Sequence, residues 1–470
     1  MTARPALDST FVADALRNVL AGQDGPARAF QRAVIDSRDV EAGDLFVALP
    51  GERTDGHDFA LDAAQRGATG LLLARPVEGA SNVACFFVPD TLAALQRLAV
   101  AWRDALPSLE VIGVTGNVGK STTKFITAAI LAKHYRVQAH QANYNNEIGV
   151  PLCLLDLRPE TERAVIEMGM YTTGEIAQLC RWTRPRTGIV LNVGPVHLER
   201  AGSLEAIARA KRELIEALPP DGHAILNVDD PLVRAMAAHT SAHVWTVGIS
   251  SEAEVRGADI VSRGAEGFDF TLSYQGRSRS LHVPLPGGHL VTNILAAAAA
   301  GLADDIEFDA VCDAIEALRV PTRLTVRRLP RDITVLDDTY NASPAATLAA
   351  LDVLAETPGR HLALLGDMLE LGEVAAAEHA RVGRRAAETV DMLFTVGALA
   401  RGISDTARGD GLADAFHCES KDEALTRVRA ELRPGDVLLV KASRALALDT
   451  VVRALAGSEA STPVGKASAR

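Results

Sequence analysis

A glycine-rich segment, GVTGNVGKST at residues 113–122, ends in a lysine and two hydroxyl residues. Glycines let backbone N–H groups close around phosphate oxygens, and a helix that starts there adds the positive end of its dipole. Lys120 is placed to reach β- and γ-phosphates, and the Ser121 hydroxyl to coordinate Mg²⁺. Val114 stands where the common GxxxxGK[ST] pattern has its first glycine. The segment still predicts a phosphate-binding loop, and the alternative is a tight turn between strand and helix.

The sequence on both sides of this loop alternates between strand and helix patterns. An apolar run at 111–114 precedes the loop and a helical stretch at 122–134 follows it. Further apolar runs lie at 164–168, 188–193 and 224–228, with helical stretches such as 204–218 between them. Runs that are apolar on both faces are typical of strands covered by helices on each side. We therefore predict that the loop belongs to a parallel α/β domain.

Two breaks divide the chain, one at Pro107 and one at Val320-Pro321. We predict an α/β protein of three domains: a small mixed α/β domain at 1–107, a central parallel-sheet ATPase domain with the phosphate loop at 108–320, and a Rossmann-like domain at 321–457. Within the central domain, residues 250–286 alternate as antiparallel strands do. In the last domain, strand patterns recur at 333–338, 361–367, 392–397 and 436–442. The small polar tail at 458–470 is expected to be disordered.

The composition excludes several classes of protein. The formal net charge of −12 argues against binding to nucleic acid, which needs a basic surface. The five scattered cysteines form no CxxC pair, so we expect free thiols in a reducing cytoplasm. We see no signal peptide, because the N-terminus lacks a basic region followed by an apolar core. We see no membrane helix, because the longest uncharged stretch, 283–303, contains prolines and glycines. We expect a cytoplasmic protein that is not embedded in a membrane and is a monomer.

Several longer segments of the sequence resemble those of the Mur ligase family of ATP-dependent amide-forming ligases. The phosphate loop is similar to that family's ATP loop, TGxxGKTT, and the resemblance extends along nearly the whole chain. The other matching segments are AVIDSRDVEAGDLFVALPGERTDGHDF (33–59), ANYNNEIGVPL (142–152), LNVGPVHLERAGSLEAIARAKREL (191–214), LDDTYNASPAATLAAL (336–351), LLGDMLELGE (364–373) and PGDVLLVKASR (434–444). Ala442 stands where the family has glycine, which leaves the role of Lys441 open.

The resemblance implies a ligase that joins D-alanyl-D-alanine to UDP-N-acetylmuramoyl-tripeptide, with ATP and an acyl-phosphate intermediate. The product would be the pentapeptide precursor of peptidoglycan, used in cell-wall biogenesis. The third residue of the tripeptide, diaminopimelate or lysine, and the acceptance of D-Ala-D-Lac or D-Ala-D-Ser stay open. One alternative is a relative that adds a single amino acid or extends folates. A second is a nucleotide-binding scaffold without turnover.

The resemblance also implies roles for individual residues. The expected catalytic residues are Lys120, Glu167, His197 and Lys211. Two Mg²⁺ ions are expected to be bound by Ser121, Glu167, His197 and Lys211. Lys211 would bind metal as a carbamate derived from CO₂. The expected ATP contacts are Thr115, Gly116, Asn117, Val118, Gly119, Lys120, Ser121, Thr122, Asn293, Arg323 and Asp338. The expected substrate contacts are Asp36, Ser37, Arg38, Asn143, Asn145, Asn146, Tyr340 and Asn341. The plainer alternatives are helix caps, a turn-rich loop and ion pairs between domains.

Overall fold

The computed structural model describes residues 5–51, 54–80, 82–140, 143–194 and 203–457. The chain divides into two units. The first contains Met1–Val255 and Leu295–Phe308, and the second contains Arg256–Ile294 and Asp309–Arg470. The predicted disordered tail at 458–470 lies outside the described residues, and the predicted domain boundaries remain a prediction.

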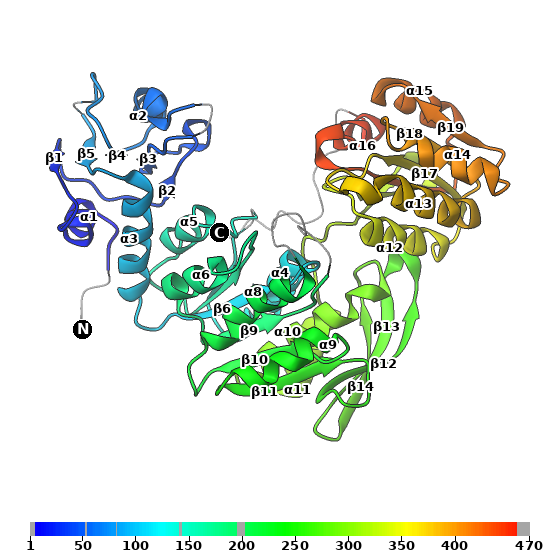
Figure 1. The fold of residues 1–470 in the computed structure, drawn as a ribbon, viewed down its shortest axis with the longest axis horizontal. Coiled ribbons are helices and arrows are strands. Elements are labelled where there is room, and N and C mark those ends of the chain that lie inside the picture. Colours follow the sequence, from blue (N-terminus) through cyan, green and yellow to red (C-terminus); the bar gives the residue numbers. More distant parts are fainter. Residues whose placement is uncertain (1–4, 52–53, 81, 141–142, 195–202, 458–470) are drawn as a thin grey trace. The chain divides into compact units, whose positions relative to one another are not determined.

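The first unit begins with a small mixed sheet, as predicted (Figure 1). Its order is β1 (Gly22–Asp24), β5 (Ala84–Phe87), β4 (Gly70–Leu73), β3 (Leu45–Val47) and β2 (Ala33–Val34). Only β1 runs antiparallel to its neighbour among the paired strands of this described sheet. The helices of this region are α1 (Ser9–Leu16), α2 (Ala60–Arg66) and α3 (Thr91–Asp104).

A parallel sheet follows in the same unit. It contains, side by side, β7 (Val137–Gln138), β8 (Arg163–Glu167), β6 (Glu110–Thr115), β9 (Thr187–Val190), β10 (His223–Asn227) and β11 (His243–Gly248). Its inner strands are buried on both faces, which explains their continuous apolar sequence. The helices are α4 (Lys120–Leu131), α5 (Gly149–Leu155), α6 (Glu175–Thr183), α8 (Leu204–Glu216) and α9 (Pro231–Arg234). The parallel α/β prediction is confirmed.

Helix α3 joins the two sheets of the first unit into one core. One continuous cluster of buried apolar side chains includes residues of the small sheet, α3, the parallel sheet and α5. The Trp102 indole N–H donates to the Leu157 carbonyl at 2.9 Å, and its ring meets Phe11 edge to face at 5.3 Å. The predicted first domain therefore shares its interior with the central sheet.

The second unit contains the predicted antiparallel strands, β12 (Val255–Ser262), β13 (Phe268–Tyr274) and β14 (Arg277–Val283). Helices α10 (Val291–Ala303) and α11 (Phe308–Glu316) follow in the chain. A six-stranded sheet comes next, in the order β15 (Thr325–Leu329), β16 (Ile333–Asp338), β20 (Asp436–Lys441), β17 (Arg360–Gly366), β18 (Met392–Val396) and β19 (Ala415–Cys418). All its neighbours are parallel except β15 with β16.

Helices cover both faces of this last sheet, so the Rossmann-like prediction is confirmed. One apolar core includes side chains of α12 (Pro344–Ala355), α13 (Ala375–Thr389) and α14 (Arg401–Gly409). A separate core on the strands includes α15 (Lys421–Glu431) and α16 (Asp449–Ala456). The sequence patterns missed β15 and β19, which are edge strands with a mixture of polar and apolar residues.

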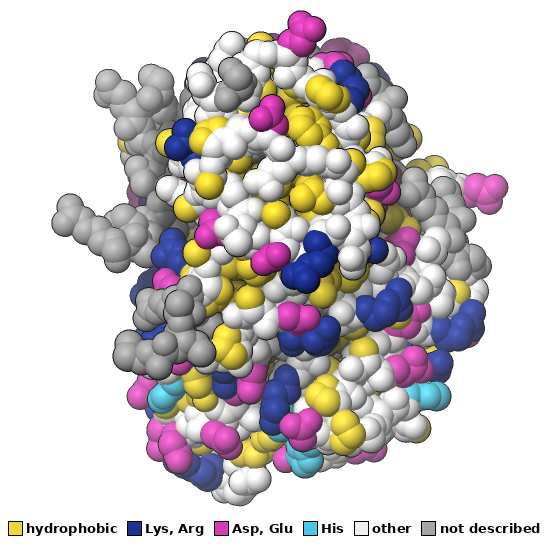
Figure 2. All heavy atoms as spheres, turned by 90° about the vertical axis from the view of Figure 1, so that its left-hand side faces the viewer, with side chains coloured by type: hydrophobic (Ala, Val, Ile, Leu, Met, Phe, Trp, Pro, Cys, Tyr) yellow, Lys and Arg dark blue, Asp and Glu magenta, His cyan; other side chains and the backbone are white. Residues whose placement is uncertain are grey.

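The five cysteines are free and buried, as expected from their spacing. In the described part of the chain, no helix has the length and apolar character needed to cross a membrane. Acidic and basic side chains are interspersed on the face shown in Figure 2. The negative net charge is therefore not gathered into one patch on that face.

Candidate active site

The predicted phosphate loop connects the end of β6 to the start of α4. Gly119 has φ 87° and caps the helix in a left-handed conformation, which a residue with a side chain adopts only at a cost. The Lys120 ammonium donates to the Gly116 carbonyl at 2.8 Å and to the Asn117 carbonyl at 3.2 Å. The loop thus presents its lysine and the first N–H groups of α4 in the same place, as phosphate binding requires.

The loop is held in shape by Asn192, a residue that the sequence analysis did not single out. The Asn192 side-chain oxygen accepts from the backbone N–H groups of Asn117 and Val118, each at 2.9 Å, and its amide donates to the Val118 carbonyl at 3.0 Å. The Asn117 side chain in turn makes two bonds to the backbone of Gly194. Strand β9 ends at Val190, short of the predicted 193, because the chain leaves the sheet to make these contacts. Asn192 lies just past a strand at the same carboxyl edge as Glu167, which is the signal that could have found it.

Ser121 and Glu167 lie together beside the loop. The Ser121 hydroxyl donates to the Glu167 carboxylate at 2.7 Å, and the Asn145 amide donates to the other carboxylate oxygen at 2.8 Å. The Ser121 hydroxyl also bonds the Asn143 side-chain oxygen at 3.3 Å. A hydroxyl, a carboxylate and an amide oxygen are the ligands that a hard cation takes, so these residues fit Mg²⁺. In the described residues no three His, Cys, Asp or Glu side chains converge on a metal site, and Mg²⁺ proteins often use one carboxylate with phosphate and water.

Lys211 lies on α8 and is 3% exposed. Burial, together with the nearby positive charge of Lys120, lowers the pKa of its ammonium from 10.5 to about 7. A mid-helix lysine is ordinarily a solvated surface residue, and Lys211 is not one; its catalytic and metal-binding roles remain predictions. His197, the other predicted ligand, lies outside the described residues.

A cavity of about 380 Å³ in the same unit includes two of the predicted substrate residues, Asp36 and Arg38, in its wall. His140 and Tyr144 contribute to the same wall, and their rings stack with centroids 4.4 Å apart. The Asp36 carboxylate bonds the Arg38 guanidinium at 2.6 Å, and this contact lowers the pKa of Asp36 to about 2. The third predicted residue here, Ser37, is buried.

Asn146, one of the three asparagines predicted to contact the substrate, bonds the backbone at the start of α5. Its side-chain oxygen accepts from the Gly149 N–H at 2.9 Å and from the Ile148 N–H at 3.3 Å, at the start of α5. The turn-rich-loop alternative therefore accounts for these bonds of Asn146, whereas Asn143 and Asn145 bond Ser121 and Glu167 beside the phosphate loop. The substrate role of Asn146 remains a prediction.

In the second unit, Asp338 and Lys441 form a buried pair at the ends of β16 and β20. The Lys441 ammonium contacts one Asp338 oxygen at 2.5 Å and the Asn341 carbonyl at 2.9 Å. The other Asp338 oxygen, Oδ1, is buried without a hydrogen-bond partner among the described residues. A buried acceptor without a partner is costly, so this oxygen is suited to a ligand hydroxyl such as that of a ribose. Lys441, whose role the sequence left open, holds this carboxylate in place.

Ala442 stands where the family has glycine, and its methyl group lies against a glycine of a neighbouring strand. Ala442 is completely buried, and a Cβ placed on Gly366 would lie 2.6 Å from its methyl group. The glycine on β17 therefore leaves the space that the alanine fills.

The remaining predicted ATP and substrate residues of this unit lie at element ends. The Arg323 guanidinium stacks over the Tyr340 ring at 4.1 Å, and both side chains are exposed. Asn293 is buried in the first turn of α10. Their contacts with ligands remain predictions.

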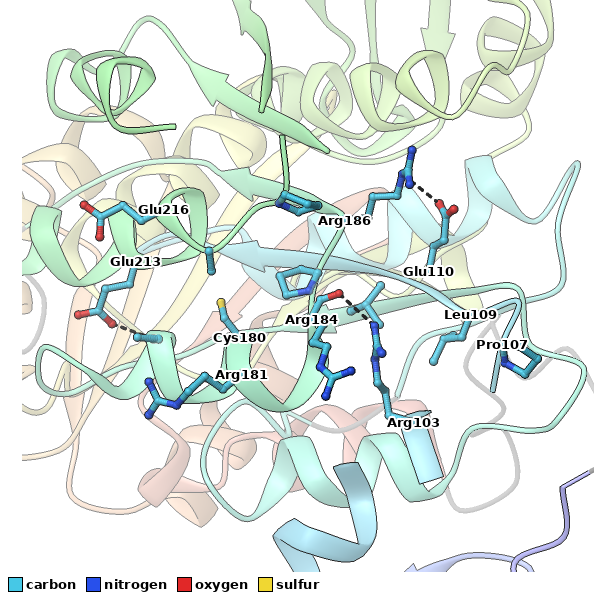
Figure 3. Close-up of a pocket in the computed structure, with 15 residues that line it drawn as sticks. Arg103, Pro107, Leu109, Glu110, Cys180, Arg181, Arg184, Arg186, Glu213 and Glu216 are labelled. Atoms are coloured by element: carbon cyan, nitrogen blue, oxygen red, sulfur yellow. Dashed lines mark hydrogen bonds and ion pairs between the residues drawn. The ribbon is translucent and has the colours of Figure 1, made fainter. Parts of the chain in front are cut away.

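A larger cavity, of about 860 Å³, lies at the opposite end of β6 (Figure 3). It is lined by Glu110 at the start of β6 and by arginines that have acidic partners: Arg184 with Asp104 at 3.0 Å and Arg186 with Asp221 at 3.0 Å. Ligands of open α/β sheets bind at the carboxyl ends of the strands, and this cavity lies at the other edge. Although this cavity is larger than the one beside Asp36, its position therefore argues against its being the active site.

Three family models match the chain. They are described as "Mur ligase family, catalytic domain" over residues 31–103, "Mur ligase middle domain" over 114–301 and "Mur ligase, glutamate ligase domain" over 322–444. The UDP-N-acetylmuramoyl-tripeptide–D-alanyl-D-alanine ligase of Escherichia coli (strain K12) is 38% identical over 446 residues, covering 94% of this chain and 97% of that protein.

Solved structures agree with these matches. A crystal structure of MurF from Acinetobacter baumannii has a TM-score of 0.87 at 29% identity, covering 96% of this chain and 99% of that one. MurF ligase from Thermotoga maritima in complex with ADP has a TM-score of 0.76 at 29% identity, covering 90% and 96%.

Proposed function

Because the chain belongs to the Mur ligase family, we propose that it joins D-alanyl-D-alanine to UDP-N-acetylmuramoyl-tripeptide at the expense of ATP. This is an amide-forming ligase reaction that yields ADP and phosphate, in the synthesis of peptidoglycan precursors. The observation that carries the proposal is the Ser121–Glu167 pair, 2.7 Å apart beside a complete phosphate loop. A scaffold without turnover would have no need of a buried carboxylate aimed at the hydroxyl of that loop.

In the first step, a carboxylate oxygen of the tripeptide attacks the γ-phosphorus of ATP. The bond to the β,γ-bridging oxygen breaks, ADP leaves, and an acyl phosphate forms. Two anions must approach each other, so catalysis depends on positioning and charge neutralisation. Lys120 and the backbone N–H groups at the start of α4 hold the phosphates, and Asn192 keeps the loop in that shape.

In the second step, the amine of the dipeptide attacks the acyl carbon, loses a proton, and expels phosphate as the C–O bond breaks. Mg²⁺, two ions by our prediction, would be held by Ser121, Glu167, His197 and Lys211, and would neutralise phosphate charge. A lysine whose pKa is about 7 is partly neutral near that pH, so its nitrogen can bond to the carbon of CO₂ and lose a proton. The resulting carbamate of Lys211 is an anionic oxygen ligand, which an ammonium is not.

The other predicted contacts complete the proposal. Asp36, Arg38 and the 380 Å³ cavity would receive the UDP-linked substrate in the first unit. In the second unit, the orphan oxygen of Asp338 would accept from the ATP ribose, and Arg323 would reach the nucleotide. Tyr340 and Asn341 would contact the substrate. We further propose that the enzyme is a monomer.

Phosphate release tests the proposal directly. The protein is incubated with ATP, Mg²⁺, UDP-N-acetylmuramoyl-tripeptide and D-alanyl-D-alanine, and each component is omitted in turn. We expect release only with the complete mixture, and little when free D-alanine replaces the dipeptide. Equal turnover with D-alanine or L-lysine would reassign the chain to a relative that adds one amino acid, and no turnover in any mixture would favour the scaffold.

A further inference from the structure

Helix α4 carries a second lysine that the reaction as described does not use. Lys124 is one turn after Lys120, and its side chain is 2% exposed. Its ammonium donates to the His140 carbonyl at 2.6 Å. Taking a charge out of water costs several kcal/mol, so an ammonium is kept in such a place only with good partners. An apolar residue would fill the same space at less cost, which points to a task for the charge.

The partner of Lys124 forms part of the substrate cavity. The His140 ring stacks on Tyr144 with an angle of 21° between the rings, and both residues line the cavity with Asp36 and Arg38. The position of this wall therefore depends on the carbonyl that Lys124 holds.

The residues next to Tyr144 bond side chains beside the phosphate loop. Asn143 and Asn145, on either side of Tyr144, bond Ser121 and Glu167 respectively. Lys124 and Glu167 also attract each other, because their opposite charges are close. Residues 143–145 thus contact the substrate cavity through the Tyr144 ring and the metal-binding residues through their amides.

We propose that Lys124 is a positioning residue that couples the substrate cavity to the phosphate loop. Its ammonium joins α4, which begins at that loop, to the His140 carbonyl, and the His140 ring stacks on Tyr144 in the cavity wall. A ligand at either site then favours the same arrangement of these side chains, so each ligand tightens the binding of the other. The inference rests on the proposed function, because it takes the cavity to be the site of the UDP-linked substrate.

Calorimetric titration of the full chain measures this coupling. The dissociation constant of ADP with Mg²⁺ is determined with and without saturating UDP-N-acetylmuramoyl-tripeptide. In the wild type we expect the substrate to tighten ADP binding by at least about fivefold, the lower end of ordinary coupling between sites. In Lys124→Met, which keeps an unbranched side chain of nearly the same length but removes the charge, we expect the ratio to fall below about twofold.

Two further variants make the test specific. Lys133→Met removes an exposed lysine just past the end of the same helix and should keep the wild-type ratio. Tyr144→Leu removes the ring stack without touching Lys124 and should also lower the ratio; it decides the question if Lys124→Met does not fold. A merely structural lysine would change the melting temperature and leave the ratio intact.

Each outcome has a distinct meaning. Coupling in the wild type and Lys133→Met, but not in the other two variants, supports the proposal. Binding of both ligands without coupling in the wild type, or equal coupling in Lys124→Met or Tyr144→Leu, overturns it and leaves the proposed function standing. No binding of the UDP-linked substrate to the wild type overturns the proposed function, and this inference with it.

Discussion

Replacing Lys211 by methionine should make the protein more stable and inactive at once. Lys211 is almost completely buried on α8, where burial and Lys120 hold the pKa of its amine at about 7. Methionine fills a similar volume without an amine. The substitution therefore removes the cost of burying a protonatable group and, with it, the atom that would carry the carbamate.

The size of the stability effect follows from the pKa. In the unfolded chain the lysine keeps its proton up to about pH 10.5, whereas in the folded protein it loses the proton at about 7. Between these values the unfolded chain holds more protons, so the free energy of unfolding rises with pH by up to about 1.4 kcal/mol per pH unit. The penalty is complete below about pH 7, where it reaches about 5 kcal/mol, and it is absent above about 10.5.

Urea unfolding in CO₂-depleted buffer at pH 7 and pH 9 measures this penalty. The matched control is Lys133→Met, because it removes an exposed lysine and leaves every other titrating group in place. We expect Lys211→Met to be the more stable variant by several kcal/mol at pH 7, and its advantage to shrink by about 2 kcal/mol at pH 9. Turnover should fall at least about a hundredfold, as when a preorganised group is removed from an active site. Equal stabilities of the two variants at pH 7, or turnover of Lys211→Met within tenfold of wild type, would refute the reasoning.

Three other substitutions test separate parts of the two units. Lys120→Ala should abolish phosphate release at an unchanged melting temperature, because it removes a charge aimed at the transferred phosphoryl group. Activity within tenfold of wild type would contradict the assignment of the phosphate loop. Asn192→Ala leaves two loop N–H groups without their acceptor, which costs about 1 kcal/mol, and should raise the KM for ATP about fivefold; an unchanged KM would count against it. Asp338→Asn strands the buried Lys441 ammonium and should lower the free energy of unfolding by about 3 kcal/mol, measured in urea; wild-type stability would contradict this.

The fold was predictable wherever local pattern and burial agree. The strands around the phosphate loop are continuous apolar runs because both of their faces are buried, and the sequence showed them within a few residues. Strand β15 was missed because it lies at an edge of the sheet and has two adjacent arginines among its five residues. Its pairing with β16 depends on tertiary contacts that no local signal carries.

The site was predictable in part for a different reason. Lys120, Ser121 and Glu167 stand at strand ends or in a glycine-rich turn, where residue type and position already indicate chemistry. Asn192 and Lys124 act through bonds to residues 74 and 16 positions away, so their importance appears only when the chain is folded. The role of Lys441 was left open because Ala442 stands where the family has glycine. The space for the Ala442 methyl group is left by Gly366 on another strand, and the sequence does not show that these two residues are neighbours.

The shared core around α3 has a practical consequence for anyone who studies this protein in pieces. A fragment cut at Pro107 would separate Trp102 from the Leu157 carbonyl that it bonds, and would uncover the apolar side of α3. Such a fragment would expose an apolar surface that is buried in the whole chain, and it would self-associate. Compounds found by screening it would tend to fit that artificial surface, so ligand searches aimed at the first sheet belong on the entire polypeptide.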